Sequence, residues 1–188
     1  MWPRRPFAGF VVRLLIIYGL FCIPWPGVRQ GYAALYRGAA NGLFGSFGAE
    51  GVVRFLPAQM GQSVVDSEFQ LRERSCPKFV TIQHDGILTG YLPTAETIAL
   101  VLATPIPWRR RWKALFYGIV LANGFIALRV YILLLYWFSI ERPCALYKPG
   151  QFWDKVLIRV FDSFNVGAFV VPVLIWILVR ASAHKWAR

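Results

Sequence analysis

The sequence predicts an α-helical integral membrane protein with about four transmembrane helices and a small β-containing extracytoplasmic insert between the first and the second. Of the 188 residues, 57% are hydrophobic and only 16% are charged, whereas soluble domains are about half apolar and a quarter charged. The apolar residues gather in long runs, and basic residues gather in short segments between them. This composition excludes a disordered chain, a coiled coil and a disulfide-dense secreted module. We therefore expect one membrane domain over residues 1–188.

Four apolar segments approach the roughly 20 residues that a helix needs to cross a bilayer. They are Phe7 to Trp25, Tyr91 to Pro107, Ala114 to Phe138 and Val156 to Val179. The second is the shortest and carries prolines, which kink or end helices. The first should be retained as an anchor, because Trp25-Pro26 stands where a cleavage site would have small residues.

The distribution of basic residues predicts the orientation of these segments. Nine Lys and Arg residues and no acidic residue occupy three short stretches, namely residues 1–6, the turn at 108–113 and residues 180–188. The net charge of +12 is therefore explained by the excess of basic residues in cytoplasmic loops. We expect both termini in the cytoplasm, anionic lipid headgroups as partners at that face of the cell (inner) membrane, and an outer loop at 140–155. No nucleic-acid-binding motif is present.

Residues 26–89 form the insert. The spacing of Tyr32, Leu35 and Tyr36 indicates an interfacial helix, and a loop whose aromatic residues reach the headgroups is the alternative. Farther along, apolar and polar residues alternate in three runs, which begin at Val53, Ser63 and Lys78. Period-two alternation predicts strands, so we expect a small antiparallel sheet.

Cysteines and histidines offer few sites. Cys76 and Cys144 fall on the predicted outer side, where they form either a disulfide or two free thiols. His84 and His184 lie on opposite sides of the predicted membrane and cannot share a metal ion. Because no nucleotide, flavin or thioredoxin-like motif is present, we expect no metal and no cofactor.

Polar residues at membrane depth are costly in lipid and should face a protein interior. They define a predicted structural cluster: Glu96, Asn123, Arg129, Arg159, Asp162 and Asn165. If a short turn joins the second and third segments, Glu96 and Arg129 become natural ion-pair partners. Arg159 and Asp162 share one helix face.

Around these residues the chain resembles the exosortase and archaeosortase membrane enzymes, over roughly residues 79–170. The shared features are an outer strand (FVTIQHDGI), a helix entering from outside, the basic turn WRRRWK, and a helix with Asn123 followed by Arg129. In that family a Cys at the outer start of the first helix is the proposed nucleophile, and an Arg on the next helix and an Arg or His on the last complete the site. Here Tyr91-Leu-Pro-Thr94-Ala-Glu96 stands where the family has Cys-Ser-Gly.

Two functions follow from this resemblance. Because the thiol is absent, we expect a scaffold or accessory subunit of a larger membrane complex with an exosortase-like framework, in contact with partner subunits. The alternative is a membrane-embedded processing enzyme, a protease or transpeptidase acting at the outer face. In that enzyme Thr94 or a water would be the nucleophile, Glu96 the base, and Arg129 and Arg159 the groups that bind a carboxylate or an oxyanion.

Overall fold

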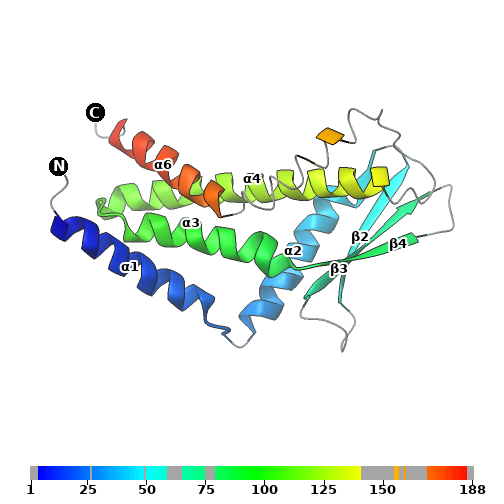
Figure 1. The fold of residues 1–188 in the computed structure, drawn as a ribbon, viewed down its shortest axis with the longest axis horizontal. Coiled ribbons are helices and arrows are strands. Elements are labelled where there is room, and N and C mark those ends of the chain that lie inside the picture. The colour runs from blue at the N-terminus through cyan, green and yellow to red at the C-terminus, as the bar shows by residue number, and fades with distance from the viewer. Residues whose placement is uncertain are drawn as a thin grey trace.

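Helices run along the long axis of the protein, and a sheet lies at one end (Figure 1). The computed structural model describes residues 4–25, 27–48, 50–58, 65–74, 79–140, 155–156, 159 and 169–185. The helices are α1 (Arg4–Cys22), α2 (Val28–Phe44), the π-helical turn η1 (Ile87–Tyr91), α3 (Leu92–Ala103), α4 (Trp108–Ile140) and α6 (Val170–Lys185). The strands are β1 (Ser46–Phe47), β2 (Gly51–Pro57), β3 (Ser67–Glu73) and β4 (Phe79–His84).

The sheet that the alternation predicts is present in the insert. It is antiparallel with the order β1-β2-β3-β4, and its register pairs Phe55 with Phe69 and Phe69 with Ile82. One face carries the buried side chains Val53, Phe55, Phe69 and Leu71, which pack on α2 and on the C-terminal half of α4.

Helix α2 covers the sheet and is joined to it by one side chain. The amide of Asn41 donates to the Phe55 carbonyl at 2.9 Å and accepts from the Phe55 N–H at 2.7 Å. A side chain on a helix thus satisfies two backbone groups of β2, which would otherwise need water or another strand. The helix lies where the sequence predicts an interfacial helix; its relation to a membrane surface stays a prediction.

The helices at the other end form a second core. Buried residues of α3, α4 and α6 pack together there, and α1 packs on α3. The Trp176 indole donates to the Thr104 hydroxyl at 2.7 Å, which joins α6 to the turn after α3. Both chain ends and this turn lie at the end opposite the sheet (Figure 1).

The prediction of about four transmembrane helices, and with it a multi-pass architecture, is wrong. In the described part of the chain only Trp108–Ser139 is long and apolar enough to cross a membrane, and 28% of its most apolar window is buried in the protein. The other apolar helices, Phe7–Cys22, Ile87–Ala103 and Val170–Ser182, have 10–17 residues.

Prolines explain much of the difference. Pro24 follows the end of α1, and Pro105 and Pro107 follow α3, so two apolar runs of the sequence continue past the ends of their helices. Residues 108–113, predicted to be a turn, instead form the beginning of α4, and the actual turn lies at 104–107.

Candidate functional site

A pocket of about 220 Å³ opens where the sheet, η1 and α4 meet. Polar side chains reach it from three elements: His84 from β4, Thr89 from η1 and Arg129 from α4. Its remaining lining is largely apolar and comprises Phe69, Ile82, Gln83, Val130, Ile132, Leu133 and Trp137. A mostly apolar cavity with a few convergent polar groups is the usual form of a ligand site.

His84, the last residue of β4, is held by aromatic side chains. Its Nε2 lies 2.9 Å from the Tyr36 hydroxyl, its ring stacks on that of Tyr36 with centroids 5.8 Å apart, and Phe69 meets it edge-on. Burial, and then the positive charge of Arg129, lower the pKa of His84 to about 4. Burial also raises the pKa of Tyr36 well above its usual range. At neutral pH the imidazole is therefore uncharged, and the tyrosine can donate a hydrogen bond to it.

The turn that carries Thr89 is held by two carboxylates. Asp66 accepts from the N–H groups of Gly86 at 2.9 Å and Ile87 at 3.1 Å, and Asp85 accepts from Ile87 and Leu88 at 2.9 and 3.0 Å. These bonds satisfy N–H groups that a helix start leaves without helical partners. They also fix the start of η1 against β3 and so place Thr89 beside the pocket.

Packing of α3 on α4 determines which residues of α3 and η1 lie beside Arg129 along the helix axes. A Cβ added to Gly118 would lie 3.3 Å from the Thr97 side chain, so these two residues face each other on antiparallel helices. Arg129 therefore lies level with the start of η1, about ten residues or about 15 Å along the axis from the level of Glu96. The structure does not bring Glu96 and Arg129 together. Glu96 instead interacts electrostatically with Tyr18 on α1.

The other residues of the predicted site are also dispersed. The Thr94 hydroxyl donates to the Gly90 carbonyl at 2.8 Å, and the exposed Asn123 donates to the Ile119 carbonyl of its own helix. Arg159 is exposed. The predicted partners Asp162 and Asn165, and the predicted disulfide between Cys76 and Cys144, lie outside the described residues.

Sequence reasoning missed His84, Tyr36 and Asp66 as site residues. His84 stands in a stretch that ends in Asp85-Gly86, which indicates a turn, and the Tyr32–Tyr36 spacing indicates a helix face. The contact between Tyr36 and His84 joins residues 48 positions apart, so no local pattern marks it. Within the described residues no group of three or more His, Cys, Asp or Glu side chains could hold a metal ion.

The chemistry of the pocket favours binding. A guanidinium, a neutral imidazole and a hydroxyl suit an anionic or hydrogen-bonding group, and neither a cysteine nor a serine is among the described residues that line the pocket. Comparison with family models, with curated proteins and with solved structures found no match. The exosortase-like resemblance therefore stays a prediction.

The lowered pKa of His84 predicts a loss of stability in acid. The unfolded imidazole has a pKa near 6.5 and the folded one near 4, so between these values only the unfolded chain binds the proton. The free energy of unfolding should fall as the pH drops from about 6.5 toward 4, by up to about 3 kcal/mol. Thermal unfolding in detergent measures this effect, and His84→Gln should flatten the curve. If the stability of the unchanged protein and that of His84→Gln depend on pH in the same way, the lowered pKa of His84 is contradicted.

The distance between Glu96 and Arg129 predicts that their substitutions act independently. Glu96→Gln, Arg129→Leu and the double variant form a thermodynamic cycle, and residues more than about 10 Å apart couple by less than about 0.5 kcal/mol. Unfolding free energies of all three variants give the coupling directly. If the double variant recovers most of the unfolding free energy that Arg129→Leu loses, the two residues form an ion pair, and this placement is wrong.

Proposed function

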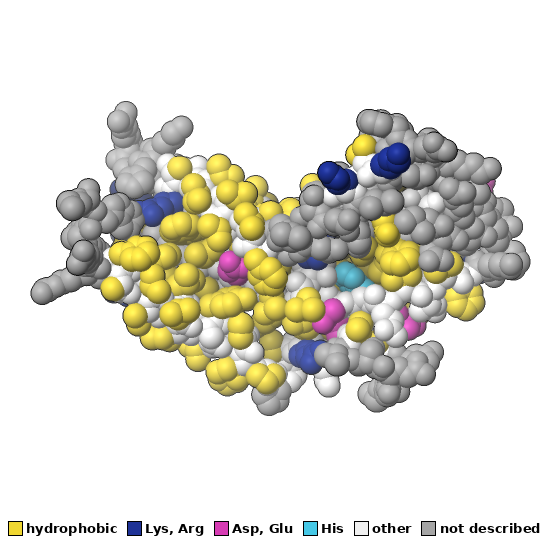
Figure 2. All heavy atoms as spheres, viewed as in Figure 1, with side chains coloured by type: hydrophobic (Ala, Val, Ile, Leu, Met, Phe, Trp, Pro, Cys, Tyr) yellow, Lys and Arg dark blue, Asp and Glu magenta, His cyan; other side chains and the backbone are white. Residues whose placement is uncertain are grey.

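We propose that the protein is a non-catalytic accessory subunit of a membrane complex, anchored through α4. The observation that carries this proposal is the apolar surface of the helices. Large hydrophobic side chains stand exposed on α1, α4 and α6: Leu15 is 65% exposed, Phe116 64% and Leu178 61%. Apolar side chains cover the helical part of the face in Figure 2. A surface of this kind needs lipid or another protein to cover it.

The beginning of α4 supports an anchor with a defined orientation. Trp108 and Trp112 are exposed there and meet edge to face, and the Arg111 guanidinium lies 5.0 Å from the Trp108 ring centroid. Tryptophan and basic residues together are typical of the cytoplasmic headgroup region. We place this end of α4 at the anionic headgroups on the cytoplasmic side of the cell membrane.

Partner helices are the second part of the proposal. Helices η1–α3 and α6 pack on α4, and α1 packs on α3. These helices carry apolar stretches of 10–17 residues, which is below the roughly 20 residues needed to cross a bilayer. Their outward apolar side chains therefore need a cover that protein helices of a complex can supply. The pocket at His84 and Arg129 could then hold an anionic group of such a partner.

The dispersion of the predicted catalytic residues supports an accessory role. Thr94 donates to a backbone carbonyl, Glu96 interacts electrostatically with Tyr18, and Arg129 lies at the pocket beyond η1. General-base activation requires nucleophile and base within hydrogen-bond reach. The exosortase-like processing enzyme is the alternative function, and this arrangement argues against it.

Photocrosslinking tests the proposal. A photoreactive amino acid at Leu15 of α1 or Leu178 of α6 should give adducts with another polypeptide in the cell, and the same probe at the exposed Ala39 of α2 is the control for indiscriminate capture. If both helix positions give adducts with lipid alone, the protein is not an accessory subunit but is anchored in the membrane without a partner.

The orientation gives a separate prediction. In a protein without its natural cysteines, Lys113→Cys places one exposed thiol at the beginning of α4. A membrane-impermeant maleimide should label this thiol only after the cells are permeabilised. Labelling of Lys113→Cys in intact cells contradicts the proposed orientation.

A further inference from the structure

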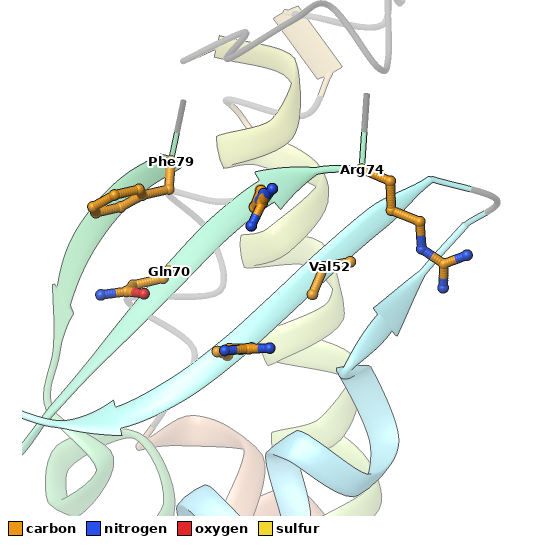
Figure 3. A pocket seen from close by; sticks show the side chains of 6 residues that line it. Val52, Gln70, Arg74 and Phe79 are labelled. Carbon is orange, nitrogen blue, oxygen red and sulfur yellow. The ribbon is translucent and has the colours of Figure 1, made fainter. Parts of the chain in front are cut away.

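The outer face of the sheet carries a groove that the proposed function does not use. Its volume is about 480 Å³, and it is lined by Val52, Arg54, Gln70, Arg72, Arg74 and Phe79. The labelled side chains stand on one face of the sheet (Figure 3). Because Val53, Phe55, Phe69 and Leu71 pack toward α4, their alternating neighbours point to the opposite face. Arg54, Arg72 and Arg74 are all exposed.

The strand register gives these arginines a regular spacing. Val52 pairs with Arg72, and Arg54 with Gln70, so Arg54 and Arg72 are diagonal neighbours about 7–8 Å apart at their Cα atoms. Arg74 follows Arg72 by two residues, about 7 Å along an extended chain, and its N–H bonds to the Glu50 carbonyl at 3.0 Å. The three arginines thus form a row with steps near 7 Å.

We propose that this groove binds an extended acidic peptide segment of a partner protein, with carboxylates at alternate residues. Alternate side chains of an extended chain point to the same side about 6.6–7 Å apart, which matches the steps between the arginines. The guanidiniums of Arg54 and Arg74 can each hold a carboxylate through two parallel hydrogen bonds. Val52 and Phe79, the latter 62% exposed, offer an apolar contact at the edge of the row.

Charge and shape favour a peptide over other anions. A single phosphate or lipid headgroup needs donors that converge on one point, whereas these arginines stand at separate positions along the sheet. A nucleic acid needs a longer basic track, and here the face carries Glu68 beyond Gln70, paired with Leu56 on one side and Gln83 on the other. Among the described residues the basic row is therefore short, and an acidic residue bounds it at one end.

Peptide binding to the full chain in detergent tests the proposal. The probe is a fluorescent peptide with the repeat Glu-Val-Glu-Val-Glu, and its glutamine analogue is the peptide control. Arg54→Gln combined with Arg74→Gln should weaken binding at least about tenfold. Arg13→Gln combined with Lys155→Gln removes the same charge at exposed residues elsewhere and should leave binding unchanged.

The outcomes separate the proposal from its competitors. The proposal is supported if the glutamate peptide binds more tightly than its glutamine analogue and if this binding depends on Arg54 and Arg74. Equal binding of the glutamine analogue, or equal weakening by the control variant, overturns it. The proposal is also overturned if the peptide does not bind and oligothymidine or vesicles with anionic lipid bind through Arg54 and Arg74. The groove would then bind nucleic acid or lipid. Each result can be read whether or not the protein belongs to a membrane complex.

Discussion

Phe69→Ala is expected to lower the free energy of unfolding by about 3–5 kcal/mol. Phe69 is 0% exposed and stands at the centre of the core between the sheet, α2 and α4, where it contacts Phe55 and His84. Removing its ring leaves a cavity that the paired strands on both sides cannot fill without breaking their register. Denaturant unfolding of the full chain in detergent, followed by tryptophan fluorescence, measures the loss.

Phe79→Ala is the matched control for Phe69→Ala. It removes the same side chain from the same sheet, but Phe79 is 62% exposed, so the cost should stay below about 1 kcal/mol. Similar losses for the two variants would show that the core does not lie between the sheet and α4.

Asp66→Ala is expected to destabilise the protein by about 2–3 kcal/mol. The carboxylate accepts two backbone N–H bonds at the start of η1, and hydrogen bonds to charged groups contribute about 1.5–3 kcal/mol each. Ile87 keeps a second acceptor in Asp85, so most of the cost arises at Gly86. Hydrogen exchange should show faster opening of the N–H groups of residues 86–90.

Asp66→Asn separates the charge from the geometry. The amide keeps one acceptor oxygen, so this variant should lose less stability than Asp66→Ala. If Asp66→Ala changes the free energy of unfolding by less than about 0.5 kcal/mol, the carboxylate does not hold the turn, and Thr89 is placed by other contacts.

Local patterns account for the elements of this fold better than for its site. Alternation predicts strands near the places where β2, β3 and β4 lie, since sheet burial follows a period of two. Apolar content predicts the helices but not their lengths, because Pro105 ends a helix inside an apolar run. The pairing of Glu96 with Arg129 fails for a different reason. Antiparallel helices bring residues together only at the same level, and that level is set by the contact of Gly118 with Thr97.

Tertiary contacts across many residues account for what the sequence could not predict. His84 lies beside Tyr36 because α2 folds back over the sheet, where the Asn41 side chain fixes it to β2. Asp66 reaches Gly86, twenty residues later, through the register of β3 with β4. Such contacts leave no periodic signal in the chain.

The native mass of the tagged protein, extracted from the membranes of its own cells in mild detergent, tests the accessory role most directly. An accessory role predicts a particle that contains this 21.4 kDa chain and at least one different polypeptide in fixed ratio, and that forms equally well with Thr94→Val and Glu96→Gln. A particle that contains only this chain and detergent would contradict an accessory role.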